Sequence, residues 1–320
     1  MAKIGYHASH EQYRPSRLLG YVQAAEQAGF DAAMCSDHFH PWSERQAESG
    51  FAWSWLGAAM QATALPFGVV NAPGQRYHPA IVAQAAATLA EMFDGRFWIA
   101  VGSGQNLNEH ITGDRWPTKE ERNERLLEAV NVMRALWQGE SVTHHGRFVV
   151  EEAKLYTRPA RPPRVIGAAI TPETAQWVAS WADGLITIGK PIEVLHEVAD
   201  AFRTGGGTGK PMMLQVQLAY APTDEEAERA AFEQWRTNIF DSGVLAALKM
   251  PREFDAVSEF VQPADLRGPV RVSADVEQQL EWLEQELDVG FDEVYLHNVH
   301  HDQEAFIRDF GARVLPKVGR

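Results

Sequence analysis

The chain has 320 residues, of which 45% are hydrophobic and 22% are charged, so the composition predicts a folded protein with a large core. A net charge of −14 argues against a nucleic-acid or anionic-membrane surface, both of which need clustered Lys and Arg. With no apolar run long enough to span a membrane, no signal region and only one cysteine, the sequence predicts a cytoplasmic protein without a disulfide or a cysteine-based zinc cluster.

The first half of the chain alternates short apolar runs with amphipathic stretches. This alternation is typical of successive strand and helix units. The predicted strands are residues 3–6, 31–36, 67–71 and 97–102, and the helices that follow them are residues 16–28, 52–62, 79–92 and 119–137. Four units are therefore expected before residue 140.

The second half continues the pattern with two interruptions. Residues 142–150 predict a small hairpin or extended insertion, reaching to about residue 160, with His144 and His145 in its turn. Residues 240–272 carry three prolines and no clean period, so we expect an insertion that covers one end of the fold. Further strands are predicted at residues 165–169, 185–188, 214–219 and 293–297, and a last helix at residues 303–315.

Eight strands in this rhythm favour a TIM (β/α)8 barrel over an open doubly wound sheet. Repeats and linkers are lacking, so residues 1–320 are interpreted as a single domain with insertions at about 142–160 and 240–272. In such a barrel the active-site residues follow the carboxyl ends of the strands. The sequence therefore predicts where a site should lie before any residue role is known.

The second strand carries the most informative of these ends. It is apolar on both faces, and it stops at Asp37 and His38, followed by the Pro-Trp pair that contains Trp42. An imidazole is the side chain best suited to proton transfer near neutral pH. Cys35 lies inside the same strand and is interpreted as a buried structural residue. The prediction is a site centred on His38.

The other strand ends are also polar and rich in histidine. Trp42 and the glycines around Ser103 suit a large planar ligand better than a metal, whereas Trp53 and Trp55 are interpreted as core residues. The GSG of residues 102–104 is an incomplete dinucleotide fingerprint. The candidate residues are His7, His10, Glu11, Asp37, His38, Asn71, Ser103, Gln105, Asn108, Glu109, Thr171, Lys190, Tyr220, His297, His300 and His301.

A metal-dependent hydrolase is an alternative interpretation of the histidines. His7, His38, His40 and His297 come from three strand ends and would have to converge on one ion. The first strand lacks the His-x-His spacing expected of such barrels, so a metal site is the weaker hypothesis.

Several motifs, in order, resemble the luciferase-like flavin and deazaflavin oxidoreductases. They are IGYHASHEQ, SDHFHPW, APGQRYHPAIVAQAAATL and VGSGQNLNEHITG, followed more weakly by WADGLITIGK and the last strand. The similarity is greatest to the F420-dependent glucose-6-phosphate dehydrogenases and to a sister branch thought to use ordinary flavin. It is strongest over residues 1–140 and fades across residues 240–272.

The resemblance implies a barrel, usually dimeric, that binds a flavin or deazaflavin ring at the strand ends. It implies that His38 is the active-site base, with Trp42 and Glu11 beside the substrate. It places Asp37, Asn108 and Thr171 at the cofactor and Lys190 at a sugar phosphate. It also implies that Val69 and Val70 bind the cofactor, through a strained and often cis backbone at the ring.

Three departures from the family pattern limit these implications. Gln105 stands where the dehydrogenases carry a proposed acid, and an amide cannot donate a proton in turnover, although Glu109 lies nearby. Ile170 and Thr171 replace a Gly-Gly that receives the cofactor phosphate. The other basic residues of the sugar-phosphate pocket have no secure counterpart, since the candidates Lys249, Arg267 and Arg271 lie where the similarity fades.

The sequence thus predicts an oxidoreductase that acts on a small molecule and uses FMN or coenzyme F420. The two cofactors are supported almost equally, and the departures from the family pattern slightly favour FMN. The reaction is hydride transfer with His38 as base, or flavin-dependent monooxygenation. An F420-dependent sugar-phosphate dehydrogenase and a non-catalytic flavin-binding barrel remain alternatives. Catalytic roles fall to His38, Trp42 and Gln105, and a homodimer is expected.

Overall fold

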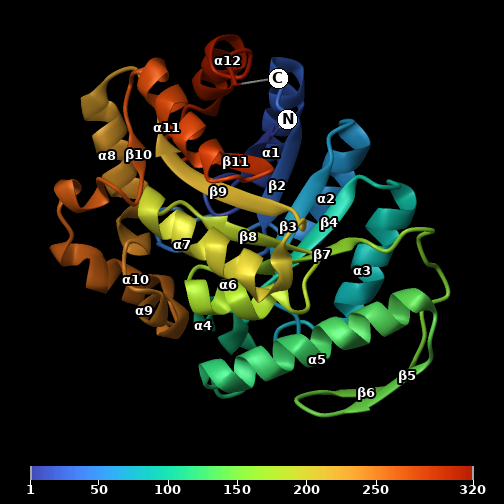
Figure 1. Cartoon of the computed structure of the whole chain (residues 1–320). Helices are drawn as coiled ribbons and strands as arrows, with labels where there is room; N and C mark the ends of the chain where they lie inside the picture. The colour runs from blue at the N-terminus through green and yellow to red at the C-terminus, as the bar shows by residue number, and fades with distance from the viewer. Residues whose placement is uncertain (1, 319–320) are drawn as a thin grey trace.

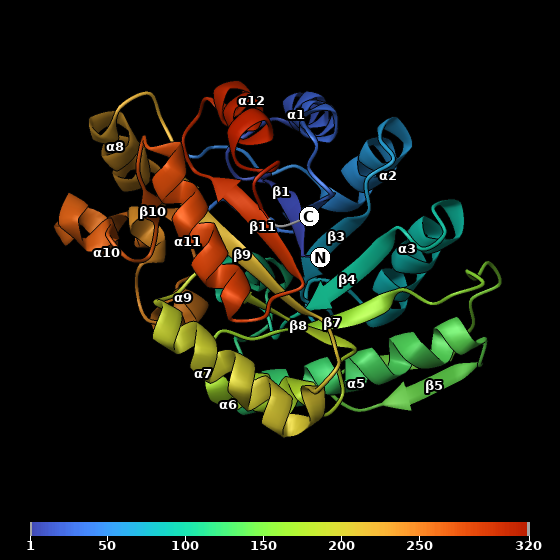
Figure 2. The ribbon, with the colours of Figure 1, turned by 45° about the horizontal axis from the view of Figure 1, so that its top comes forward.

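The computed structural model describes residues 2–318, and eight parallel strands close into a barrel within them. Strand β8 pairs with β9, which joins the two ends of the sheet, and β1 pairs with both β11 and β2. Figure 2 shows the strands surrounded by helices. The barrel strands are β1 (Lys3–Ala8), β2 (Ala32–Ser36), β3 (Phe67–Asn71), β4 (Phe97–Val101), β7 (Arg164–Ala168), β8 (Gly184–Ile188), β9 (Met212–Ala219) and β11 (Glu293–Asn298).

The helices form the outer layer (Figure 1) and begin and end at recognisable signals. Thr118 and Glu121 form a reciprocal capping box at the start of α5, and Gly29 and Gly139 end α1 and α5 in the left-handed conformation. The outer helices are α1 (Pro15–Ala28), α2 (Ala52–Ala62), α3 (Pro79–Met92), α5 (Lys119–Gln138), α6 (Pro172–Ala179), α7 (Ile192–Phe202), α8 (Asp224–Trp235), α11 (Val276–Asp288) and α12 (Gln303–Arg313). None of the helices in the described residues is long and apolar enough to cross a membrane.

Two aromatic rings lie inside the barrel, packed among aliphatic side chains such as Met34 and Ile166. Trp98 and Tyr295 are buried with their ring centroids 5.7 Å apart. Each ring occupies space left by a glycine, since a Cβ on Gly68 would lie 2.0 Å from Trp98 and one on Gly5 would lie 2.3 Å from Tyr295. Because these residues precede the carboxyl ends of their strands, the rings close the barrel on the side of its amino end. The large cavity of the barrel therefore lies on the other side of this layer, at the carboxyl ends of the strands.

The sequence predictions of the barrel and its strand order along the chain are confirmed, with strand ends shifted by one or two residues. The hairpin is also present, as β5 (Val142–His145) and β6 (Val149–Ala153). The prediction that His144 and His145 lie in its turn is wrong, because both belong to β5. His144 is held there by Glu128 of α5, with 2.9 Å between its Nε2 and a carboxylate oxygen.

The proline-containing segment before the last strand forms short helices over the carboxyl end of the barrel. Asn106 donates from its side chain to the carbonyl of Ala247 at 2.9 Å, which ties the helix α9 (Ser242–Ala247) to α4 (Asn106–Glu109). A second helix, α10 (Pro251–Val257), follows. The two-residue strand β10 (Arg271–Val272) then pairs in parallel with β9, outside the barrel, which the sequence did not predict.

Candidate active site

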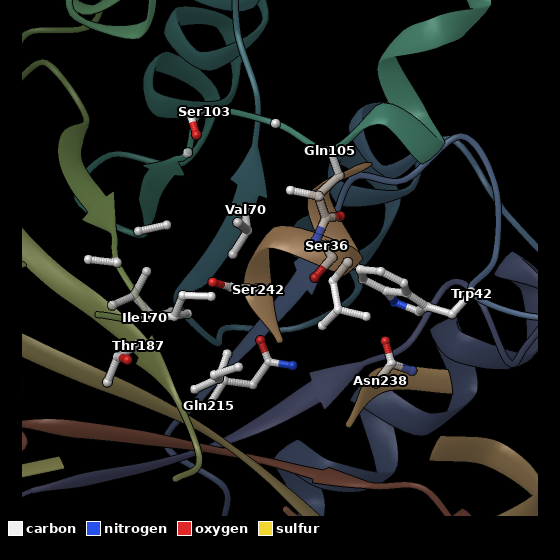
Figure 3. A pocket seen from close by; sticks show the side chains of 18 of the residues that line it. Ser36, Trp42, Val70, Ser103, Gln105, Ile170, Thr187, Gln215, Asn238 and Ser242 are labelled. Atoms are coloured by element: carbon white, nitrogen blue, oxygen red, sulfur yellow. The ribbon is translucent and has the colours of Figure 1, made fainter. Parts of the chain in front are cut away.

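A cavity of about 830 Å³ lies at the carboxyl ends of the strands, as the barrel fold predicts. Strand ends form its floor and walls, and residues of α9 such as Ser242 close part of the mouth. Figure 3 shows Trp42 and Gln105 pointing into it from one side and Gln215 from another. The cavity has the size of a site for a cofactor or a drug-sized ligand.

His38 and Glu11 form a pair at the edge of this cavity. The Nδ1 of His38 lies 2.7 Å from Oε1 of Glu11, a close charge contact, although the N–H direction is too oblique for an aligned hydrogen bond. The hydroxyl of Ser9 donates to the other carboxylate oxygen at 2.9 Å. Burial alone raises the pKa of Glu11, but the His38 imidazole outweighs it and holds that pKa well below its usual value. Glu11 is therefore an anion that orients His38.

Trp42 packs between His38 and the segment that covers the mouth. Its ring meets the His38 ring edge to face at 5.2 Å and the Phe254 ring of α10 at 5.4 Å. The loop that carries Trp42 is tied to α10 by Ser43, whose hydroxyl donates to Asp255 at 2.6 Å. The position of the tryptophan ring thus depends on both the barrel and the covering helices.

The carboxylate of Asp37 is buried, and it is already occupied by protein donors. It accepts hydrogen bonds from the indole of Trp53 at 3.0 Å and from the amide of Asn71 at 2.8 Å. The Tyr77 hydroxyl lies 3.3 Å from its second oxygen, and Arg76 lies within 3.7 Å. Asp37 therefore fixes the start of the His38 loop, and its predicted contact with a cofactor stays a prediction.

Asn108 also holds this loop. Its side-chain oxygen accepts hydrogen bonds from the backbone amides of Phe39 at 2.8 Å and of His40 at 3.2 Å. The His40 ring turns away and stacks on His110 at 5.3 Å. The loop after β2 is thus anchored on both sides of His38, by Asp37 before it and by Asn108 after it.

Gln105 lies at the start of α4 and lines the cavity. Its side chain makes no hydrogen bond to any described residue, so its amide is free for a ligand. Glu109, one turn later, accepts from the backbone amide of Arg76 at 2.7 Å. Burial raises the pKa of Glu109, an effect that Arg76 only partly offsets.

The remaining predicted residues divide into those that reach the cavity and those that do not. Val70, Thr171 and Lys190 line it, whereas the Val69 side chain points outward into the helix-side core, because successive strand residues alternate in direction. Residues 2–318 contain no cis peptide, so the bond between Val69 and Val70 is trans, and the contact of these residues with a cofactor stays a prediction. Outside the cavity lie His10, Tyr220, His300 and His301.

His7 and His297 are side by side on the cavity floor, with ring centroids 4.5 Å apart. Both are buried, and burial lowers the pKa of each imidazole, to about 4 for His297. Within residues 2–318, no three His, Cys, Asp or Glu side chains are grouped to hold a metal ion.

Acidification is expected to destabilise the fold in part through His297. Its pKa of about 4 lies below the usual 6.5, so the unfolded chain takes up the proton first as the pH falls. The free energy of unfolding should therefore fall between pH 6.5 and pH 4, by up to about 3 kcal/mol from this residue. Urea unfolding at several pH values measures this slope.

The control for this slope is His145, which is exposed on the hairpin. Between neutral and acidic pH, the free energy of unfolding of His297→Asn should fall by roughly 2 kcal/mol less than that of the wild type. The fall for His145→Asn should equal that of the wild type. Equal slopes for wild type and His297→Asn would contradict the assignment.

Together these features define a class of protein: an α/β barrel enzyme with a cavity sized for a planar cofactor and a carboxylate-oriented histidine at its edge. The luciferase-like monooxygenase family model matches residues 1–294. The chain belongs to this family, whose members use F420 or flavin for oxidation and reduction.

Individual relatives are similar over all or most of the chain. An F420-dependent glucose-6-phosphate dehydrogenase of Beutenbergia cavernae is 33% identical, with 99% of this chain and 98% of the relative covered. An F420-dependent hydroxymycolic acid dehydrogenase of Mycobacterium tuberculosis is 37% identical over 73% of this chain and 66% of that protein. The structure of an F420-dependent secondary alcohol dehydrogenase with an F420-acetone adduct superposes with a TM-score of 0.92, at 31% identity, covering 100% of this chain and 99% of that one.

Proposed function

We propose that this protein is an F420-dependent dehydrogenase that interconverts an uncharged secondary alcohol and its ketone, with His38 as the base. The observation that carries the proposal is the His38 and Glu11 pair at the edge of the cavity. The relatives named above are F420-dependent dehydrogenases, which supports F420 as the proposed cofactor. This support outweighs the slight preference for FMN that the sequence alone suggested.

The cavity fits such a cofactor in shape and in charge. F420 combines a flat tricyclic ring with an anionic tail, and the glycines at residues 102 and 104 allow a ring to approach the backbone. Lys119 and Arg122 line the wall that a tail would follow, and the Nε of Arg122 is buried without a partner among the described residues. Thr171 caps α6 with its hydroxyl at the same wall.

The chain's own residues handle the proton. When bound, F420 supplies a two-electron acceptor for the hydride of the carbinol carbon. Because the Nδ1 of His38 faces Glu11, Nε2 is the atom left to take the hydroxyl proton as the C–H bond breaks and the carbonyl forms. Glu11 stabilises the imidazolium so produced, and Trp42 shields it from water.

Gln105 simplifies this acid–base chemistry. An amide donates and accepts hydrogen bonds but does not titrate, so it can orient a substrate oxygen or a ring edge without supplying a proton. His38 is then the residue that accepts the proton in oxidation and returns it in reduction.

The cations around the cavity argue for an uncharged substrate rather than a sugar phosphate. Arg267 pairs with Glu228 at 2.7 Å, and Arg271 pairs with Glu286 at 3.1 Å. Lys249 lies outside the cavity, so Lys190 is the lysine of the expected phosphate pocket that lines it, and it forms no salt bridge within the described residues. One lysine provides weaker phosphate recognition than a cluster of basic residues.

Titration of the purified protein with F420 and with FMN, followed by tryptophan fluorescence, tests the proposal. Trp42 and Trp235 line the cavity, so a bound ring should quench their emission. We expect F420 to give saturable quenching at concentrations roughly tenfold lower than FMN, or lower still. We also expect F420 to be reduced when 2-butanol is added. Quenching by FMN alone, or by neither cofactor, would overturn the assignment.

A further inference from the structure

We propose that His7, His297 and Gln217 form a second subsite, which hydrogen-bonds an uncharged oxygen of the substrate other than the one at His38. The inference rests on the proposed function, because it assumes that an alcohol occupies the cavity. It makes His7 a specificity-determining residue rather than part of the proton-transfer pair.

The strand register brings these three side chains together. Tyr6 pairs with Leu296, which sets His7 beside His297, and His297 pairs with Gln217 on β9. All three line the cavity. His297 is two residues after Tyr295 on β11, so the three side chains lie just beyond the layer of Trp98 and Tyr295, toward the carboxyl ends of the strands. They form a polar row across three adjacent strands on the cavity floor.

The hydrogen bonds of Gln12 fix the tautomer of His297. The Gln12 amide nitrogen donates to the carbonyl of Val299 at 3.0 Å and to the side-chain oxygen of Gln234 at 3.1 Å. Its oxygen therefore accepts from Nε2 of His297 at 2.8 Å. The Nδ1 of the neutral ring is then a bare acceptor, buried and without a partner in the described chain.

His7 is the strongest indication of a missing partner. The residue is 3% exposed, and neither ring nitrogen bonds any group in residues 2–318. Buried polar groups in folded proteins are nearly always hydrogen-bonded, so an imidazole with two unpaired nitrogens on the wall of a cavity is suited to receive a ligand. Gln217 also lines the cavity, and its side-chain amide adds a donor and an acceptor.

The charge state of the row selects an uncharged group. Burial and the neighbouring His297 lower the pKa of His7, so both imidazoles are neutral at pH 7. Glu11 is anionic and close enough to influence both rings, which disfavours phosphate or carboxylate at this point. A hydroxyl can both donate to and accept from such a row, and a carbonyl oxygen can accept from it, in each case without any charge compensation.

Two substrates with the same carbon skeleton test the subsite, namely 2,3-butanediol and 2-butanol. We expect wild-type kcat/KM with F420 to favour the diol by about tenfold, which corresponds to about 1.4 kcal/mol, and His7→Phe to bring the ratio near one. The matched control is His10→Phe, the same substitution at a buried histidine that packs on Trp55 outside the cavity and should keep the wild-type ratio. A ratio unchanged by His7→Phe would overturn the proposal.

Two further measurements separate this proposal from the cofactor assignment. In cofactor-free wild-type protein, the imidazole nitrogen NMR signals of His7 should shift with 2,3-butanediol and not with 2-butanol, whichever cofactor the enzyme uses. Equal responses to the two alcohols would refute the subsite even if the His7 variant failed to fold. F420 affinity of His7→Phe should stay within about threefold of wild type; a tenfold loss would assign His7 to the cofactor instead and overturn the proposal.

Discussion

Replacing His38 with Ala is expected to lower kcat for alcohol oxidation by about 10²- to 10⁴-fold, the usual contribution of a positioned base. F420 affinity should change little, because the substituted group handles the substrate proton. Added imidazole should restore part of the rate by entering the space that the side chain leaves. Steady-state rates of F420 reduction measure the loss.

The matched control is His40→Ala, two residues along the same loop. His40 stacks on His110 and does not line the cavity, so its loss should reduce kcat by no more than about threefold. If both variants were equally impaired, the effect would belong to loop structure and the role of His38 as base would be wrong. If the His38 variant kept wild-type kcat with normal cofactor binding, proton transfer would have to be assigned to another group.

Replacing Gly68 with Ala is expected to cost about 3 kcal/mol or more in the free energy of unfolding. The added Cβ would lie 2.0 Å from the Trp98 ring, which is buried inside the barrel between strands that cannot separate without breaking their pairing. Urea unfolding followed by circular dichroism measures the change. Loss of soluble protein at physiological temperature would be the extreme form of the same result.

Gly57→Ala provides the comparison. This glycine lies within α2, and a Cβ there would meet no described atom within 4 Å apart from its own helix backbone. The change should stabilise the protein by up to about 1 kcal/mol, because alanine favours the helix and loses less backbone entropy on folding. Equal effects at the two glycines would show that the ring contact at Gly68 is not the cause.

The barrel could be predicted from sequence because each strand is an apolar run that a helix follows. The residues of the site that directly follow a strand, such as His38 and Gln105, could be placed for the same reason. Side-chain direction was harder to predict, as Val69 and Val70 show: the motif pairs them, but alternation sends one outward and one into the cavity.

Contacts between distant residues could not be predicted from local pattern. Trp53 was interpreted as core and is buried, yet its indole also donates to Asp37, which changes the role of that carboxylate. The pairing of His7 with His297 joins the two ends of the chain and follows from the register of β1 against β11. The homodimer implied by the resemblance stays a prediction.

The aromatic layer of Trp98 and Tyr295 also has a kinetic consequence. A barrel sealed at its amino end is a blind channel, so cofactor, substrate and product share the mouth beside α9. In a blind channel the deeper ligand must enter first and leave last. Steady-state turnover should then follow a compulsory order of binding and release, imposed by two rings that never touch the chemistry.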